Sequence, residues 1–332
     1  VSEPIHANNP HYVILRVSEP GTGVGLMNDG FDGIPVKAGD RYDVSFFARQ
    51  LYMNEGYGEA ISIDGKPMPM IARLEGKGGK SLGEVKMTVE GWNWGQASAT
   101  ITATESDDNA RFVLLATAKG GIAIDHVSLF PAKTFRDRKN GLRDDLARTI
   151  ADIHPKFIRF PGGCVAHGMG LHNIYRWKET IGPVEQRRGQ KNFWNYHQSM
   201  GLGYFEYFQF CEDIGAKPLP VLAAGVSCPH TDQKRGKGQQ AIPMAEMPAY
   251  IQDILDLIEW ANGPSTSNWG AKRAAAGHPE PFGLKYLGIG NEDHISPEFK
   301  ERFKMIQDAI QAKHPEIVII GYGKTDLQDR LA

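Results

Sequence analysis

The stretch 284–293, LKYLGIGNED, reads as a buried strand that ends in polar residues, and it decides how the second half of the chain is interpreted. Its apolar residues run to Gly290, and Asn291, Glu292 and Asp293 follow directly. In open α/β folds, ligands bind at the carboxyl ends of the parallel strands. An amide and two carboxylates at such a strand end therefore mark the place where we expect a functional site.

Helices and short strands alternate on both sides of this stretch. Leu142, Leu146, Ile150 and Ile153 share one helical face, and Pro155 separates that helix from a strand at 156–160. Apolar spacing and end signals also predict helices at 204–214, at 249–261 and from Ser296, and strands at 217–224, 284–290 and 317–320. This alternation predicts parallel strands, either in a doubly wound sheet or in a (β/α)8 barrel.

The ends of the predicted strands favour the barrel. Three strands end in small or polar groups, at 160–164, 224–228 and 290–293. That face carries the chemistry in a (β/α)8 barrel. The chain has no glycine-rich turn of the dinucleotide-binding type after an early strand and no P-loop, so a nucleotide-binding doubly wound sheet lacks its signature. Because only about four barrel strands can be counted, we predict that residues 133–332 form part of a (β/α)8 TIM barrel.

Residues 1–132 have a different pattern. Short β-type runs such as 12–17, 42–48 and 111–116 are separated by Gly, Asp and Asn turns, and Pro131 ends the last of these runs. Many short strands of this kind are typical of a β-sandwich. We therefore predict an all-β domain at 1–132 and an α/β domain at 133–332.

Composition excludes several classes of function. The chain has 332 residues and a net charge of -2, so it lacks the positive electrostatic potential that attracts nucleic acid or an anionic membrane. No apolar run is long enough to span a bilayer. We expect no nucleic-acid partner, no membrane partner and no cofactor. The basic run 233–240 is expected to be a solvated loop. The first residue is not Met, so localisation stays open: secreted or periplasmic if a signal was removed, cytoplasmic otherwise.

The three cysteines are interpreted as structural or subsite residues. Cys164, Cys211 and Cys228 lie far apart in the sequence, without a CxxC pair. We expect neither a disulfide framework nor a structural zinc site, and we expect Cys211 and Cys228 to have structural roles.

Glu292 and Asn291 together suit acid–base chemistry on a sugar. A carboxylic acid that is partly desolvated at a barrel mouth can stay protonated near neutral pH and act as a general acid. The amide of Asn291 offers both a donor and an acceptor, which suits a sugar hydroxyl. The dipeptide alone also fits a surface carboxylate at a strand end beside a turn residue.

Several segments, in the same order, resemble the α-L-arabinofuranosidases of glycoside hydrolase family 51, in the branch with a sandwich module beside the barrel. They are RFPGGC (159–164), YRWKETIGPVEQR (175–187), GLGYFEYFQFCEDIGAKPLPV (201–221), ANGP (261–264), GHPEPF (277–282) and YLGIGNE (286–292). The resemblance spans residues 135–321. It implies a (β/α)8 barrel, a carbohydrate-binding-module-like sandwich and removal of terminal L-arabinofuranose with retention of configuration. Its setting is hemicellulose degradation and arabinose metabolism.

The resemblance assigns roles to five residues. Glu292 matches the family's acid/base after barrel strand four, and Asn291 matches the residue that holds the sugar 2-hydroxyl. Arg159 and Cys164 match positions that shape the arabinose subsite, and Trp177, in the matched YRWK loop, is expected to wall the pocket. Each has a plainer alternative: Arg159 pairs with a buried carboxylate, Cys164 is a small core residue, and Trp177 only packs.

A retaining glycosidase needs a second carboxylate, about 5 to 5.5 Å from the first. The resemblance places the nucleophile on strand seven, beyond residue 332, and places the family's first strand before the sandwich, so we expect a central portion of an enzyme. Asp293 and Glu185 are poor substitutes, and we expect each to form a salt bridge. An incomplete barrel leaves open sheet edges, so we expect a second copy or another segment of the same enzyme to complete it.

The sequence leaves two main functions open. The first is a retaining exo-glycoside hydrolase that removes terminal α-L-arabinofuranosyl residues from arabinan or arabinoxylan, or the acid/base-bearing part of one. The second is a non-catalytic carbohydrate-binding fragment of such an enzyme. A related barrel glycosidase with another sugar preference is a third, weaker alternative, because Asn-Glu after strand four recurs across that wider group.

Overall fold

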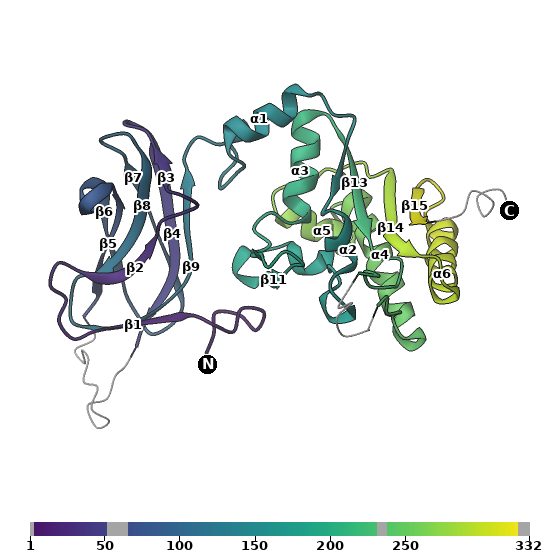
Figure 1. Ribbon diagram of the computed structural model, residues 1–332, viewed down its shortest axis with the longest axis horizontal. Helices are drawn as coiled ribbons and strands as arrows, with labels where there is room; N and C mark the ends of the chain where they lie inside the picture. Colours follow the sequence, from purple (N-terminus) through teal and green to yellow (C-terminus); the bar gives the residue numbers. More distant parts are fainter. Residues whose placement is uncertain (1–2, 52–65, 231–237, 325–332) are drawn as a thin grey trace. The chain divides into compact units, whose positions relative to one another are not determined.

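A computed structural model describes residues 3–51, 66–230 and 238–324 (Figure 1). The chain divides into two compact units, Val1–Ile150 and Ala151–Ala332, and helix α1 (Asp144–Asp152) crosses the division. Residues 233–237 of the basic run lie outside the described part of the chain. No helix in the described part is long and apolar enough to cross a membrane.

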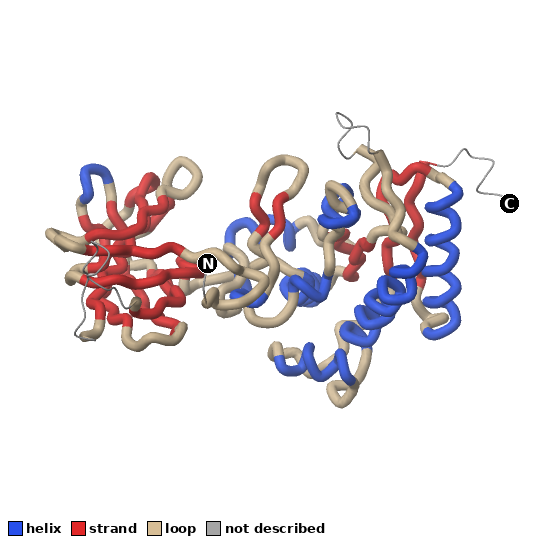
Figure 2. Tube along the Cα trace, turned by 90° about the horizontal axis from the view of Figure 1, so that it is seen from below, coloured by secondary structure: helices blue, strands red, loops and turns tan. Residues whose placement is uncertain are grey.

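Within residues 3–51 and 66–150, the first unit forms two antiparallel sheets. Its strands are β1 (Val13–Val17), β2 (Val24–Asn28), β3 (Ile34–Val36), β4 (Arg41–Gln50), β5 (Met68–Glu75), β6 (Ser81–Val89), β7 (Gly95–Thr102), β8 (Asp107–Ala116) and β9 (Gly120–Pro131). One sheet has the order β1-β9-β4-β7, and the other has the order β2-β8-β5-β6 with β3 paired to β8. Figure 2 shows this unit built mostly of strands.

One hydrophobic core lies between these two sheets. It holds Phe46 of β4 and Ile124 of β9 from one sheet, and Leu74 of β5 and Leu114 of β8 from the other. Alternate residues of β4 are buried, as expected for a strand with one face on a core. The β runs predicted at 12–17, 42–48 and 111–116 are confirmed as strands.

In residues 151–230 and 238–324, the second unit shows four strands of a parallel sheet and their connecting helices. The strands are β10 (Phe157–Phe160), β13 (Lys217–Leu222), β14 (Tyr286–His294) and β15 (Val318–Lys324). The helices are α2 (Gly163–His167), α3 (Tyr204–Ile214), α4 (Met247–Asn262), α5 (Asn268–Ala275) and α6 (Pro297–Lys313), and a small hairpin pairs β11 (Gln190–Lys191) with β12 (His197–Gln198).

The strand order of the parallel sheet, β10-β13-β14-β15, follows the chain order. A doubly wound sheet reverses its strand order at a switch point, and these four strands do not. Side chains from α3, α4 and α6, such as Phe208, Ile254 and Ile306, share one core with Leu287 and Ile289 of β14. The helix-by-strand alternation read from the sequence is therefore confirmed.

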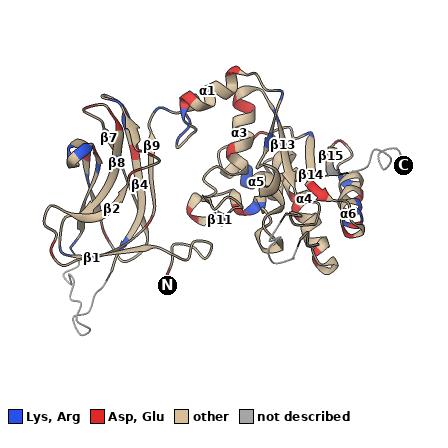
Figure 3. Cartoon of the chain, viewed as in Figure 1, with Lys and Arg blue, Asp and Glu red and all other residues tan. Residues whose placement is uncertain are grey.

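Local signals explain where these helices begin and end. Helix α3 begins after Gly203, whose backbone N–H donates to the Glu206 carboxylate at 2.8 Å, and ends at Gly215 in the left-handed conformation. Helix α6 begins at Pro297 after Ser296, whose hydroxyl accepts a hydrogen bond from the Phe299 N–H. Figure 3 shows Lys, Arg, Asp and Glu side by side along α6, which indicates an ordinary solvated face.

Apolar residues are exposed at both edges of the parallel sheet. Phe157 of β10 is 56% exposed, and Val318 and Ile320 of β15 are 44% and 42% exposed. Leu146 and Ile150, on the apolar face predicted for α1, are also exposed. Apolar periodicity placed that helix correctly, but within the described residues its apolar face does not join either core.

Candidate active site

The end of β14 is irregular where the sequence changes from apolar to polar. Ile289 pairs with Gly321, and Asp293 pairs with Gly323, so four steps along β14 face two steps along β15. The strand was expected to end at 290, but it resumes its pairing beyond this bulge. A bulge bends a strand and re-aims its side chains, and bulges are frequent beside active sites.

The backbone of the bulge has an unusual conformation. Gly290 has a φ of 87°, and Glu292 has a φ of 49°, which lies in the left-handed region that side chains other than glycine rarely adopt. Asn291 and Asp293 are buried, whereas Glu292 between them is exposed. Surrounding structure holds Glu292 in a conformation that costs free energy, as is common at functional sites.

Asn291 is fixed by Arg159 across the sheet. Arg159, near the end of β10, donates a hydrogen bond from Nη2 to Asn291 Oδ1 at 2.7 Å. Because this oxygen accepts from a guanidinium, the amide nitrogen of Asn291 is left to donate elsewhere. Gly163 makes this arrangement possible: a Cβ there would lie 2.7 Å from Asn291 Oδ1.

Asp293 and His167 form a buried polar pair behind Asn291. His167 Nδ1 lies 2.9 Å from Asp293 Oδ1, and neither side chain is exposed. The other carboxylate oxygen of Asp293 accepts a hydrogen bond from the Asn291 backbone N–H at 2.8 Å. The pair thus joins α2 to the bulged end of β14 and fixes the backbone next to Glu292. This carboxylate–imidazole contact stands where a salt bridge was expected for Asp293, and it is an ion pair only when His167 is protonated.

Two cysteines lie beside His167. Cys164 is half-buried in α2, Cys228 is fully buried after β13, and the donor atoms of these two residues and His167 all lie within 4.8 Å of one another. Burial, and then the neighbouring thiol of Cys164, raise the pKa of Cys228 to about 12. None of the three cysteines is in a disulfide bond.

Trp177 lies in the core instead of at the strand ends. Its side chain is 2% exposed, and its indole N–H donates to the backbone oxygen of Asp253 at 2.8 Å. Its ring packs against Trp260 and Trp269, with centroids 5.9 and 5.2 Å away. A side chain enclosed in this way does not face a ligand, so the expected pocket wall is corrected to a packing residue.

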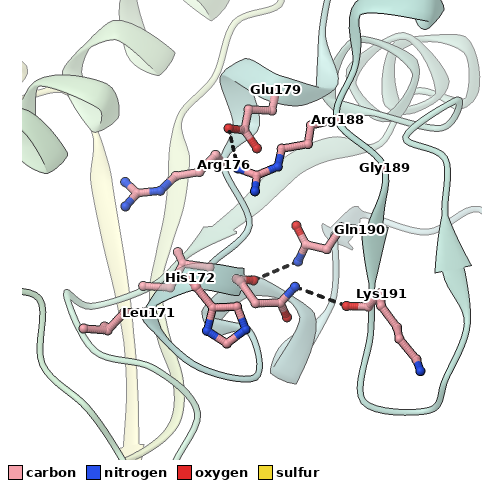
Figure 4. A pocket seen from close by; sticks show the side chains of 10 residues that line it. Leu171, His172, Arg176, Glu179, Arg188, Gly189, Gln190 and Lys191 are labelled. Carbon is pink, nitrogen blue, oxygen red and sulfur yellow. Dashed lines mark hydrogen bonds and ion pairs between the residues drawn. The ribbon is translucent and has the colours of Figure 1, made fainter. Parts of the chain in front are cut away.

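A pocket of about 360 Å³ lies in the loops between residues 171 and 191 (Figure 4). Gln190 Nε2 donates to the backbone oxygen of Asn173, and Asn173 Nδ2 donates to that of Lys191. Arg188 lies 3.6 Å from Glu179 at the wall. None of the five residues expected from the sequence lines this pocket, so we treat it as separate from the cluster at the strand ends.

The structure therefore places the Arg159 guanidinium against the Asn291 amide, next to the backbone of Glu292. Sequence reasoning missed His167 and the closeness of Cys164 to Cys228. The closeness of Cys164 and His167 did have a sequence signal. In the segment CVAH these two residues have the i, i+3 spacing of neighbours on one helical face. The proximity of Cys228, 64 positions after Cys164 in the sequence, depends on the fold and had no local signal.

Known proteins that resemble this chain point to one family. A family model described as the alpha-L-arabinofuranosidase 1 domain matches residues 149–330. An extracellular exo-alpha-L-arabinofuranosidase of Streptomyces chartreusis is 41% identical over 97% of this chain and 37% of its own length. Alpha-L-arabinofuranosidase 1 of Arabidopsis thaliana is 37% identical over 91% of this chain and 41% of its own length.

A solved structure gives the same result. The arabinose-bound MgGH51 α-L-arabinofuranosidase superposes with a TM-score of 0.84 and 31% identity, covering 97% of this chain and 50% of that chain. This chain therefore spans half of these relatives' length or less.

Proposed function

The chain belongs to the α-L-arabinofuranosidases of glycoside hydrolase family 51, and from that premise we propose that it supplies the acid/base and the arabinose subsite of a retaining exo-acting enzyme. Its substrate is a terminal α-L-arabinofuranosyl residue of an arabinan- or arabinoxylan-type hemicellulose. The observation that carries the proposal is the bulge of β14, which presents Glu292 at a strand end beside the Arg159–Asn291 pair.

Glu292 is proposed as the general acid/base. In a retaining mechanism this carboxyl protonates the leaving oxygen and then activates the water that releases the sugar from the enzyme. An exposed carboxyl at a strand end can reach a sugar bound at the carboxyl ends of the parallel strands. The positive φ of Glu292 supports this role, since a functional requirement explains why a strained position carries glutamate instead of glycine.

Asn291 and Arg159 are proposed to orient the sugar. Arg159 occupies the amide oxygen of Asn291, so the amide nitrogen can donate to the sugar 2-hydroxyl. Hydrogen bonds to that hydroxyl strengthen in the transition state of glycoside hydrolysis. Cys164, half-buried on α2, borders the same subsite in this proposal, and Trp177 supports the site only through packing.

The proposed architecture is a carbohydrate-binding-module-like β-sandwich at 1–132 and part of a (β/α)8 barrel at 133–332. Two antiparallel sheets around one core support the first assignment. Four parallel strands in chain order support the second.

The exposed apolar residues of β10 and β15 support a further proposal, that more strands pack against these edges. We assign them to a completing segment that also carries the nucleophilic carboxylate. A second copy of the chain is the other candidate for this place. We call the chain together with that segment the completed enzyme.

Leaving-group dependence tests the role of Glu292. In the completed enzyme, Glu292→Gln should lower hydrolysis of an alkyl α-L-arabinofuranoside by about 10²- to 10⁴-fold, because an alkoxide needs a proton to leave. Cleavage of the bond to a nitrophenolate should fall much less, because that leaving group needs little protonation. Glu301→Gln, at an exposed carboxylate of α6, is the matched control and should change neither rate. Equal losses for both substrates would argue against an acid.

Intact mass tests the completing segment. The chain has a mass of 36.7 kDa, and release of arabinose should belong to a species of larger mass. A 36.7 kDa species that binds arabinoside without turnover would support the carbohydrate-binding alternative instead.

A further inference from the structure

Three metal-binding side chains meet between α2 and the segment after β13. They are Cys164, His167 and Cys228, and their donor atoms all lie within 4.8 Å of one another. No local sequence pattern unites all three, and the expectation from the sequence was that no zinc site exists. The fold instead brings a residue of the loop after β13 to a Cys-x-x-His pair on one helix.

The second observation is a ring nitrogen without a partner. His167 is fully buried, and its Nε2 has no hydrogen-bond partner among the described residues. Leaving a buried polar atom unsatisfied costs about 1–3 kcal/mol, so such an atom in a folded protein calls for an explanation. A ligand bound at Nε2 would supply one.

The other ring nitrogen of His167, Nδ1, is hydrogen-bonded to a carboxylate, as is common for histidine ligands in metal sites. Asp293 Oδ1 lies 2.9 Å from Nδ1, so the carboxylate accepts the Nδ1 proton and leaves the lone pair on Nε2. Histidine ligands almost always donate their second N–H to a carboxylate, a backbone carbonyl or a water, which fixes the tautomer and the ring orientation. Asp293 is itself held by the Asn291 N–H, so the orientation of this ring is fixed by β14.

We infer that Cys164, His167 and Cys228 bind one thiophilic metal ion of the Zn²⁺ or Cu⁺ class. Two sulfur donors and one imidazole suit these ions and do not suit Ca²⁺ or Mg²⁺, which take oxygen ligands. Zinc lies about 2.3 Å from sulfur and about 2.0–2.1 Å from nitrogen, so donor atoms that lie up to 4.8 Å apart must move inward to share one ion. Three protein ligands leave one coordination position open.

This inference goes beyond the proposed function, and its test does not depend on turnover. Metal binding would tie α2 to the segment after β13, and Cys164 would be shared between the metal and the proposed sugar subsite. Bound metal and bound sugar would then exclude each other at that thiol.

Cobalt is the probe, because Co²⁺ replaces Zn²⁺ and reports thiolate ligands by its absorption spectrum. The reduced 332-residue chain should bind one Co²⁺ with a thiolate-to-metal charge-transfer band, and Zn²⁺ should displace it. Cys164→Ser and Cys228→Ser should each weaken the band and lower the affinity by more than about 100-fold. Asp293→Asn should lower the affinity by about 10- to 100-fold through the histidine.

Cys211→Ser is the matched control, because Cys211 is a buried thiol of α3 outside the cluster. It should leave the stoichiometry and the spectrum unchanged. If circular dichroism shows that Cys228→Ser does not fold, the Co²⁺ spectrum and affinity of Cys164→Ser serve as the test, because Cys164 is only half-buried. The inference is overturned if the reduced chain shows no charge-transfer band, or if the Cys164→Ser/Cys228→Ser double variant keeps it.

Discussion

Replacing Glu292 by glycine should make the protein more stable while it abolishes catalysis. Glu292 has a φ of 49°, and a side chain in the left-handed region costs roughly 1–2 kcal/mol. Glycine removes this cost, but its greater conformational entropy in the unfolded chain lowers the free energy of unfolding by about 0.4–1 kcal/mol. Because Glu292 is exposed, little packing is lost. We expect Glu292→Gly to raise the free energy of unfolding by about 1 kcal/mol.

The assay is urea unfolding of the chain followed by tryptophan fluorescence. Trp177 and Trp260 are buried in the core of the second unit, so the unfolding of that unit changes the emission, to which Trp92 and Trp94 of the first unit also contribute. Glu292→Gln keeps the strained backbone and should leave the urea midpoint unchanged. Asp32→Gly, at an exposed residue with a φ of 57° in the first unit, is the control for strain relief outside the site and should leave catalysis unchanged.

Two results would refute this reasoning. A lower urea midpoint for Glu292→Gly would mean that the backbone at this position is not strained. Arabinoside turnover by Glu292→Gly at the rate of the unchanged completed enzyme would mean that Glu292 is not the acid/base, whatever its conformation.

Three other changes test the surroundings of the site. Gly163→Ala puts a Cβ 2.7 Å from Asn291 Oδ1 and should lower kcat/KM by about 10- to 100-fold, because the amide loses a hydrogen bond worth roughly 1.5–3 kcal/mol. Asp293→Ala leaves the buried Nδ1–H of His167 without its acceptor and should lower the free energy of unfolding by about 1–3 kcal/mol in urea. Burial raises the pKa of Cys211 to about 12, so at pH 8 the thiol is almost wholly protonated, and iodoacetamide should label it only after unfolding.

Each of these changes has a control and an outcome that contradicts it. For Gly163→Ala the control is Gly201→Ala, whose added Cβ would have its nearest neighbour at an ordinary 3.4 Å, so kcat/KM should not change. An equal loss of kcat/KM in both variants would mean that the loss at Gly163 does not come from displacing the Asn291 amide. Asp308→Ala, on an exposed turn of α6, should cost little, and a similar loss at both aspartates would argue against the buried pair. Rapid labelling of native Cys211 would contradict its burial.

Much of the second unit could be predicted because its signals are local. Helix α3 has the bounds expected for it, since Gly203 with Glu206 marks its start and Gly215 marks its end. Proline residues and a serine cap placed the starts of α6 and β10 within a residue or two. Signals of this kind act within one or two turns of chain, so the sequence is enough to read them.

The geometry of the site depends on contacts that no local signal encodes. The bulge at the end of β14 exists because Asp293 pairs with Gly323 of another strand, so a reading of 284–293 alone ends the strand too early. His167 and Asp293 are 126 positions apart, and their buried contact becomes visible only when the fold is known. Trp177 was misread for the same reason, because its motif is shared with the family while its exposure is set by the packing around it.

The most direct test of the account is the configuration of the product when azide rescues Glu292→Ala in the completed enzyme. With an aryl α-L-arabinofuranoside of good leaving ability, the nucleophile still forms the glycosyl-enzyme, and azide then attacks it without needing a general base. The account predicts faster turnover with azide and an α-configured arabinofuranosyl azide, the result of two inversions. A β-configured azide would identify Glu292 as the nucleophile, and full activity without azide would show that it is neither.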